Sequence, residues 1–402
     1  MTNKYRAFTR RQALQASIAG MALAASWRPA LAAGEPIVFG TLTPLTGAGG
    51  PYGPHMRDAV AAVIAEVNAA GGVLGREIKL VSEDDQTNPD AGVKAAKKLI
   101  DVDKVIAVIG TWASSVTTAV APLCWESKTM LFTVSGADSI TKLPHQGFII
   151  RTQPNSQLQI RRATEFMVSQ GAQHLAYIGP QTPFAQTSID LMTALAKDMG
   201  KTMTGLIYEA DKTSYRSEVD QLLKSKPDFL ILGGYTPDTI VLLRDMYRAG
   251  YQGRMLGFAY AVNDKLLAAL PKEVTEGIYT FQPSPALNSA AYDRIKTKLN
   301  LGEVDPYTAQ TYDHANLAIL ALAKAGAASG IAIHDHVRDI SQGGGEAVDN
   351  AIDGLKLLKA GKKIDYSGAS GPCDFDAIGD ILSAKFRFDR IKDGKPGIIQ
   401  LI

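Results

Sequence analysis

The chain has 402 residues, of which 46% are hydrophobic, and its formal net charge is only +2, from 42 Lys and Arg against 40 Asp and Glu. A balanced charge with no basic block in the body of the chain argues against nucleic acid or an anionic membrane surface as a partner. The length exceeds what one ordinary core supports and predicts two domains.

Residues 1–32 are typical of an export signal. Basic residues, the last two being Arg10 and Arg11, precede an apolar stretch over 13–25, and the small residues Ala30-Leu31-Ala32 follow. The Arg pair indicates the twin-arginine route, although the flanking residues also fit general secretion. No later apolar run is long enough to span a membrane. We therefore expect cleavage after Ala32 and a soluble periplasmic product.

From Ile37 onward, short apolar runs alternate with amphipathic stretches of a dozen or more residues, with Gly, Pro or Asp at the junctions. This rhythm is typical of βαβ units and a parallel sheet. The predicted strands are 37–41, 78–81, 105–110, 130–134, 174–179, 205–208, 229–233 and 277–281. The predicted helices are 56–72, 88–100, 157–170, 188–199, 236–249 and 309–328.

Ligands of such folds bind outside the carboxyl ends of the strands. The segment "GTWASSVTTAVAP" places Trp112, Ser114 and Ser115 at one of these ends. Two interpretations are open for its hydroxyl groups. They cap the following helix, or they form a site for the oxygen atoms of a ligand together with the free N–H groups of the helix.

The usual catalytic and cofactor motifs are absent, including the nucleophile elbow, the glycine-rich phosphate loops and the H-E-x-x-H zinc pattern. His334 and His336 in "HDH" make a weak metal pair and are predicted to lie in a solvated loop. The triplet Glu83-Asp84-Asp85 favours a structural role over cation binding. We expect no enzymatic activity, no cofactor and no metal.

Cys124 and Cys373 are the two cysteines of the chain. An oxidising compartment permits a disulfide between them, and two buried free thiols are the alternative.

Four blocks, "GTLTPLTGAGGPYG", "EVNAAGGVLGREIKLVSEDDQTNP", "KVIAVIGTWASS" and "KPDFLILGGYTPDT", resemble the type I periplasmic solute-binding proteins of the leucine/isoleucine/valine-binding family. The resemblance runs from Glu35 to Phe388. It implies an α/β fold with two doubly wound parallel-sheet lobes, joined by a three-segment hinge and closing on a small ligand. It also implies an ABC importer permease as the partner and a monomeric receptor.

The same resemblance, with polar crossings at 151–157 and 282–288, predicts two discontinuous lobes. Lobe 1 comprises 33–153 and 283–380, and lobe 2 comprises 154–282 and 381–402.

The family's strand-end Ser pair and a following loop hold the ligand's carboxylate. This implies Ser114, Ser115 and the loop with Ala137 and Asp138 as ligand contacts. Asp138 leaves two directions open, since it either accepts a ligand N–H group or turns away from the ligand. The remaining expected contacts are the aromatic residues Tyr52, Trp112, Phe184, Tyr235, Phe258 and Tyr260.

In the second lobe, the resemblance places Pro180 and Phe184 in the loop where the family often carries an Asp and a Tyr. It places Phe258, Ala259 and Tyr260 where amino-acid binders carry a Glu, so the usual ammonium partner is lost. We expect a small amino-acid-like, aromatic or aliphatic carboxylate as the ligand. Alternatives are a urea or short-amide receptor of the same fold, a secreted α/β hydrolase, and a sensory binding module.

Overall fold

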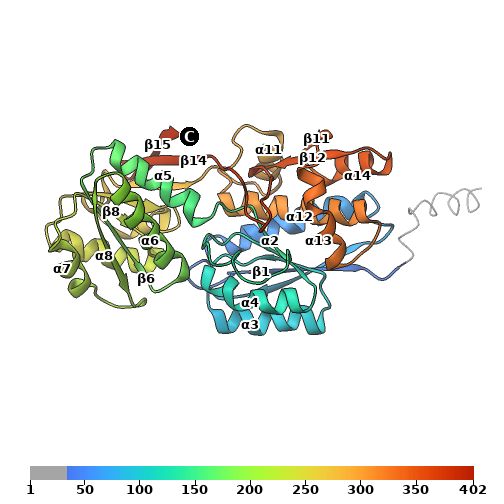
Figure 1. Ribbon diagram of the computed structural model, residues 1–402, viewed down its shortest axis with the longest axis horizontal. Helices are drawn as coiled ribbons and strands as arrows, with labels where there is room; N and C mark the ends of the chain where they lie inside the picture. Colours follow the sequence, from blue (N-terminus) through green and yellow to red (C-terminus); the bar gives the residue numbers. More distant parts are fainter. Residues whose placement is uncertain (1–33) are drawn as a thin grey trace, which may run out of the picture.

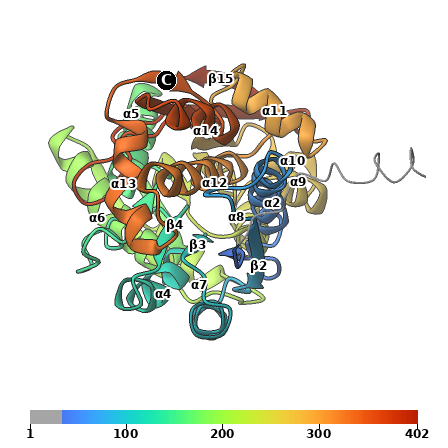
Figure 2. The ribbon, with the colours of Figure 1, turned by 90° about the vertical axis from the view of Figure 1, so that its right-hand side faces the viewer.

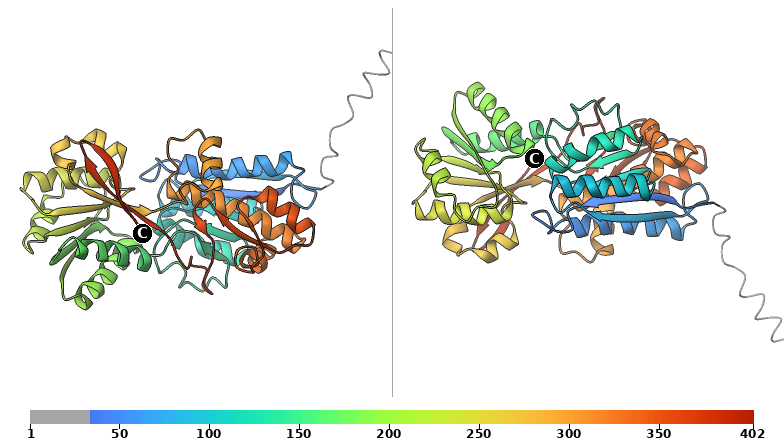
Figure 3. Two further views of the ribbon diagram at one scale, coloured as in Figure 1. Left: turned by 90° about the horizontal axis from the view of Figure 1, so that it is seen from above. Right: turned by 90° about the horizontal axis from the view of Figure 1, so that it is seen from below.

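The computed structural model describes residues 34–402, so the predicted export signal lies outside the described residues. Two α/β bodies lie side by side along the long axis of the molecule (Figure 1), and we call them lobe 1 and lobe 2. Each is built on its own mainly parallel sheet. The chain forms most of lobe 1, then lobe 2, returns to lobe 1 and ends in lobe 2, as the colours in Figure 3 show.

Lobe 1 contains a five-stranded parallel sheet. Its strands, in spatial order, are β2 (Ile78–Asp84), β1 (Ile37–Thr43), β3 (Ala107–Gly110), β4 (Met130–Thr133) and β5 (Ile149–Arg151). The strands β3 and β4 are buried on both faces, which is why they are continuous apolar runs in the sequence. The lobe also carries a small sheet of β11 (Glu346–Val348), β12 (Ile364–Gly368) and β13 (Gly371–Pro372).

Helices cover both faces of the lobe 1 sheet. Figure 2 shows β3 and β4 between α12 on one side and α4 on the other. The helices of this lobe are α2 (Gly53–Ala69), α3 (Pro89–Lys97) with a π-helical extension η1 (Lys98–Val102), α4 (Ser114–Glu126), α11 (Ala290–Lys298), α12 (Pro306–Ala325), α13 (Gly330–Ser341) and α14 (Ala351–Lys359).

The helix α12 is the central element of lobe 1, with every residue from Pro306 to Leu322 buried. Its start is fixed by Asp305, whose side chain accepts hydrogen bonds from the N–H groups of Tyr307 and Thr308, both at 3.0 Å. Its end is fixed by Gly326, which adopts the left-handed conformation with φ 67°. These caps place Tyr307 at the end of the helix nearest lobe 2.

Lobe 2 contains a seven-stranded sheet. Its strands, in spatial order, are β15 (Lys395–Leu401), β14 (Phe386–Lys392), β10 (Tyr279–Pro283), β9 (Arg254–Phe258), β8 (Phe229–Leu232), β6 (His174–Pro180) and β7 (Thr202–Tyr208). The two C-terminal strands are antiparallel and the others parallel. The helices are α5 (Ser156–Ser169), α6 (Pro183–Asp198), α7 (Arg216–Leu223), α8 (Thr236–Arg248), α9 (Asp264–Ala269) and α10 (Lys272–Thr275).

The chain crosses between the lobes in three short segments that lie together. The crossings span residues 152–154, 283–285 and 381–384, and one small space beside the start of α12 is lined by residues 152, 154, 283–285, 381, 383 and 384. Three of these residues, Pro154, Pro283 and Pro285, are prolines, whose fixed φ limits the ways in which the crossings bend.

The structure contradicts one sequence prediction and contains several elements outside the predicted ranges. His334 and His336 lie in α13 and not in a loop. The prediction overlooked the apolar spacing of Ile333, Val337 and Ile340, which form the buried face of a helix. The predicted strands also did not include β5, β9, the small sheet β11–β13 or the hairpin β14–β15.

Both cysteines are free, buried thiols, and they lie in separate hydrophobic clusters of lobe 1. Within residues 34–402, no single helix has the length and apolar character needed to cross a membrane. The pair α12 and α13 meets that requirement only when taken together, and the two helices are bent by 102° at their junction.

Candidate ligand-binding site

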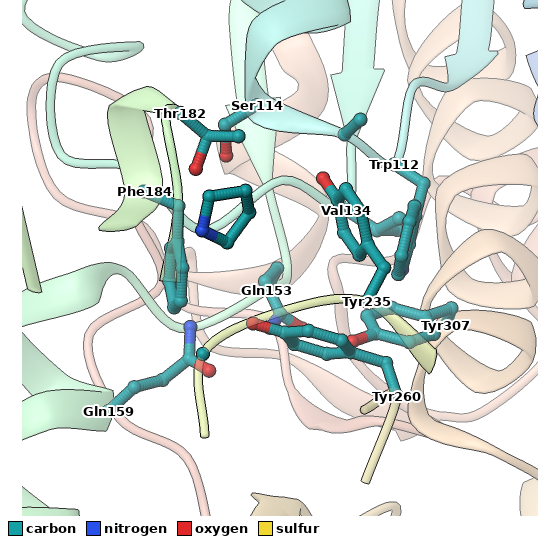
Figure 4. A pocket seen from close by; sticks show the side chains of 14 residues that line it. Trp112, Ser114, Val134, Gln153, Gln159, Thr182, Phe184, Tyr235, Tyr260 and Tyr307 are labelled. Atoms are coloured by element: carbon teal, nitrogen blue, oxygen red, sulfur yellow. The ribbon is translucent and has the colours of Figure 1, made fainter. Parts of the chain in front are cut away.

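A cavity lies between the two lobes at the carboxyl ends of both sheets (Figure 4). Lobe 1 and the first crossing line it with Trp112, Ala113, Ser114, Val134, Gly136, Gln153 and Tyr307. Lobe 2 lines it with Gln159, Pro180, Thr182, Phe184, Gly233, Tyr235 and Tyr260. The cavity volume is about 40 Å³, enough for about three water molecules. The lobes are therefore closely apposed.

Three helices begin at this cavity, and their N-termini give it a positive potential. The helix α4 follows Ala113, α6 follows Thr182 and α8 follows Tyr235. In α4 and α8 no side chain caps the first turn, so N–H groups remain free for a ligand. No Asp, Glu, Lys, Arg or His lines the cavity in residues 34–402. Such a site suits a carboxylate or a neutral oxygen, and it provides no carboxylate to balance an ammonium group.

The hydroxyl groups near the start of α4 divide into two sets. Thr117, Thr133 and Ser135 all direct their hydroxyl groups to the backbone of Thr111, with Thr133 Oγ1 and Ser135 Oγ donating to its carbonyl oxygen at 2.8 Å. Thr111 has φ 56°, a left-handed conformation that is unfavourable for threonine. These buried hydroxyl groups therefore stabilise the turn. Ser114 alone among the hydroxyl residues of this segment lines the cavity.

The loop after β4 contacts Ser114 and α5. Ser114 Oγ accepts a hydrogen bond from the N–H group of Ala137 at 3.2 Å. Asp138 is 7% exposed, and its Oδ1 accepts from the N–H group of Gln157 at 3.3 Å, in the first turn of α5. Its carboxylate is thus directed to a helix terminus. In the structure, the Asp138 carboxylate points away from the cavity, which is the second of the two directions that the sequence left open.

Aromatic rings from both lobes meet around Trp112. Its ring centroid lies 5.2 Å from that of Tyr235 and 5.7 Å from that of Tyr260, both in lobe 2. Within lobe 1 the corresponding distances are 5.8 Å to Tyr52 and 5.7 Å to Tyr307. Burial raises the pKa of Tyr235 and that of Tyr307, so both phenols are neutral hydrogen-bonding groups at physiological pH.

Five of the predicted contact residues line the cavity, namely Trp112, Ser114, Phe184, Tyr235 and Tyr260. Tyr52 lies at its edge, where its hydroxyl donates to the carbonyl oxygen of Ala259 at 3.4 Å. Phe258 stacks on Tyr260 with 5.2 Å between ring centroids and lies behind it. Ser115, Ala137 and Asp138 do not line the cavity.

Four polar lining residues were not predicted from the sequence. Gln153 lies in the first crossing, Gln159 in α5, Thr182 at the N-cap of α6 and Tyr307 in the first turn of α12. The "DPY" stretch before α12 carries an N-cap and Pro signal that could have located Tyr307 at a helix start. No local signal marks Gln153 or Gln159.

The acidic triplet lies beside the site without lining it. Asp84 accepts hydrogen bonds from Thr46 and Gln86, and Glu83 forms an ion pair with Lys98. Asp85 is fully buried, and burial raises its pKa to about 7. Across residues 34–402, no group of three or more His, Cys, Asp or Glu residues has a metal-binding arrangement.

Comparison with known proteins identifies the family. The family model described as "Periplasmic binding protein" matches residues 36–395. The chain belongs to this family. Among curated relatives, an amino acid binding protein of Pseudomonas aeruginosa is 26% identical over 297 residues, covering 72% of this chain and 79% of its own. The chemotactic signal transduction substrate-binding protein BasB of Halobacterium salinarum is 24% identical, covering 86% and 84%.

Solved structures of other periplasmic binding proteins have the same fold. The leucine binding protein LivK of Thermotoga maritima superposes with a TM-score of 0.78 at 19% identity, covering 91% of this chain and 98% of its own. A solute binding protein of Rhodopseudomonas palustris in complex with benzoate gives 0.72 at 17% identity, covering 91% and 96%. These matches confirm the predicted two-lobed α/β fold. The relatives are binding proteins without enzymatic activity, so the hydrolase alternative is set aside.

Proposed function

We propose that this periplasmic binding protein is the solute receptor of an ABC importer, and that its solute is a small carboxylate with an aromatic or apolar body. The observation that carries the proposal is the lining of the cavity. The uncapped N-termini of α4 and α8 and the Ser114 hydroxyl offer hydrogen-bond donors. Trp112, Phe184 and three tyrosines offer apolar surface, and charged side chains are absent from the lining in residues 34–402.

A carboxylate gains from such donors, because a buried oxygen needs a partner for each lone pair it exposes. The apolar body of the solute would pack against the rings, which require only contact area and shape. An amino acid would bring an ammonium group for which the lining has no anion. Similar folds accept both classes, since neighbouring structures are described as complexes with isoleucine and with 4-hydroxybenzoate. The uncharged lining of the cavity favours an aromatic carboxylate over an amino acid.

Binding would work by closure of the lobes about the three crossings. A solute shifts the open and closed populations only through its better fit to the closed form. The cavity volume of about 40 Å³ is smaller than the roughly 150 Å³ of an engineered protein cavity that binds benzene. The lobes would therefore sit slightly farther apart around a bound solute than they do here.

Calorimetric titration tests the solute class directly. Benzoate, phenylacetate, hexanoate, leucine and butyramide are titrated into the mature protein under one set of conditions. Tight binding of an aromatic carboxylate with weak or undetectable binding of leucine is the expected result. Tight binding of leucine alone would contradict the proposed class.

A second candidate is a receptor for a short neutral amide such as urea. The observation in its favour is the small enclosed volume together with a lining free of charge. Butyramide in the same titration separates the two candidates.

The periplasmic location is part of the proposal. It is supported by the family and by the export pattern of residues 1–32. N-terminal sequencing of protein secreted by a bacterial host should begin near Ala33, and sedimentation should give a monomer.

A further inference from the structure

The end of the cavity opposite Ser114 is built from amide and phenol groups. Figure 4 shows Gln153, Gln159 and the hydroxyl ends of Tyr260 and Tyr307 gathered there, away from Ser114 and Thr182. We infer that this end recognises a second, uncharged polar group of the solute, and that Gln310 orients Gln153 for that contact. The inference rests on the proposed function, to which it adds a hydroxyl group on the solute ring.

The two glutamines form a buried amide pair. Gln310 Nε2, on α12, donates to Gln153 Oε1 at 2.7 Å, and the side chains are only 1% and 4% exposed. Gln153 lines the cavity, whereas Gln310 lines the space among the crossings. With Oε1 engaged, Gln153 Nε2 makes no hydrogen bond to residues 34–402. Gln153 therefore presents its amide N–H groups to the cavity.

The orientation of this pair has a physical cause. Gln310 Oε1 finds no hydrogen-bond partner within residues 34–402. Turning both amides over would satisfy that oxygen and leave the NH₂ group of Gln310, with two donors, unpaired in its place. One unpaired carbonyl oxygen is less unfavourable than two unpaired N–H groups. Gln310 is thus a positioning residue that directs a donor of Gln153 toward the solute.

Gln159 supplies the complementary acceptor. Its Nε2 donates to the carbonyl oxygen of Pro154 at 2.6 Å, which leaves Oε1 to accept a hydrogen bond from the solute. Burial raises the pKa of both Tyr260 and Tyr307, so neither phenol contributes a charge. A solute hydroxyl group satisfies this arrangement, because it accepts from Gln153 and donates to Gln159. The solute class is a hydroxylated aromatic carboxylate with the two groups at opposite ends of the ring.

The test compares 4-hydroxybenzoate with 4-methylbenzoate, which differ by a hydroxyl in place of a methyl group of similar size. Calorimetry on the wild-type protein should give at least about tenfold tighter binding of 4-hydroxybenzoate, the usual effect of leaving buried polar groups unpaired. Gln153→Met should reduce that ratio to about twofold or less, since it removes the donor while keeping the volume. Gln252→Met, in an exposed loop, is the matched control and should keep the wild-type ratio.

Gln310→Met tests the positioning role, because Gln310 does not line the cavity. It should lower the ratio several-fold while benzoate affinity stays near the wild-type value.

The titrations distinguish recognition of the solute hydroxyl group, the positioning role of Gln310 and the proposed carboxylate class. Equal affinity of the wild type for the hydroxyl and methyl compounds would overturn this inference while leaving the proposed carboxylate class in place. A ratio retained in Gln310→Met but lost in Gln153→Met would overturn the positioning role. Binding of leucine or butyramide with no response to any benzoate would overturn the proposed function itself.

Discussion

Arg151 and Asp380, which are 229 residues apart in the chain, form a bidentate ion pair in lobe 1, each next to the start of a crossing segment. Arg151 Nε donates to Asp380 Oδ1 at 2.6 Å and Nη2 to Oδ2 at 3.0 Å, with the guanidinium fully buried. Arg151 Nη1 also donates to the carbonyl oxygen of Ala137 at 2.7 Å. The pair thus fixes the first and third crossings and the loop that contacts Ser114.

Asp380→Ala should destabilise the protein by about 3–5 kcal/mol, because it leaves the Arg151 guanidinium buried without its counter-ion. Urea unfolding measures the change. Asp339→Ala is the control, since it removes only the partly exposed contact to His336 and should cost under about 1 kcal/mol. Similar losses in both variants would contradict the role given to the buried pair.

Ser114→Ala should weaken carboxylate binding by about 1–3 kcal/mol, since a buried solute oxygen would lose its donor. Ser115→Ala, at the next position, does not line the cavity and should leave the affinity unchanged. Calorimetry with benzoate measures both. An equal loss in both variants would mean that the effect comes from the start of α4 as a whole.

Gly136→Ala should weaken binding of any solute by holding the lobes apart. A Cβ atom at Gly136 would lie 2.8 Å from the ring of Phe184, across the cleft. Gly136 is not at a positive φ, so the backbone accepts alanine and the folded lobes should be unaffected. Small-angle scattering with saturating solute should show less compaction than in the wild type. If the variant compacts fully and keeps the wild-type affinity, Gly136 and Phe184 do not approach each other closely in the solute-bound protein.

Asp138→Ala should lower the free energy of unfolding by about 1 kcal/mol, and with it the melting temperature. The variant loses the hydrogen bond that the Asp138 carboxylate accepts from the Gln157 N–H group in the first turn of α5. The affinity for benzoate should stay the same, because the carboxylate does not line the cavity. A large change in affinity without a change in melting temperature would indicate that Asp138 contacts the solute.

Asp85→Asn should change how stability depends on pH. Burial raises the pKa of Asp85 to about 7 in the folded protein, above the unfolded value of about 3.9. Between those values the folded state holds more protons, so wild-type stability falls as the pH rises. The advantage of Asp85→Asn over the wild type should therefore grow by roughly 1.4 kcal/mol per unit from pH 4 to 7 and then level off. Urea unfolding at four pH values measures the difference in free energy of unfolding between the variant and the wild type. A difference that does not change with pH would contradict the raised pKa of Asp85.

Most of the buried parallel strands were predicted because each is a short apolar run. The central strand β9 was missed, since its first two residues, Arg254 and Met255, are only partly buried. The predicted ranges 130–134 and 229–233 each extend one residue past β4 and β8. The hairpin β14–β15 was missed since β15 is exposed along its whole length, which leaves no apolar alternation to detect.

The residues of the candidate site also fall into those that a local sequence pattern predicts and those that it does not. Ser114 and Tyr235 were predicted because each follows an apolar strand, and the fold type places strand ends at the cleft. Gln153 and Gln310 lie 157 positions apart and meet only when the first crossing packs on α12. Such a contact depends on tertiary packing, for which neither residue carries a local pattern.

The hairpin β14–β15 has a consequence for biosynthesis. The strand β14 pairs with β10, so the sheet of lobe 2 gains its last two strands from residues 386–401, after the whole return of the chain through lobe 1. As the ribosome releases the chain from its N-terminus, lobe 1 lacks strands until residue 372 has been made, and lobe 2 lacks strands until residue 401 has been made. Native pairing across such long separations is slow to form. The lobes of a nascent chain of this design would therefore stay incompletely folded until these segments have emerged, which gives chaperones time to bind the chain first.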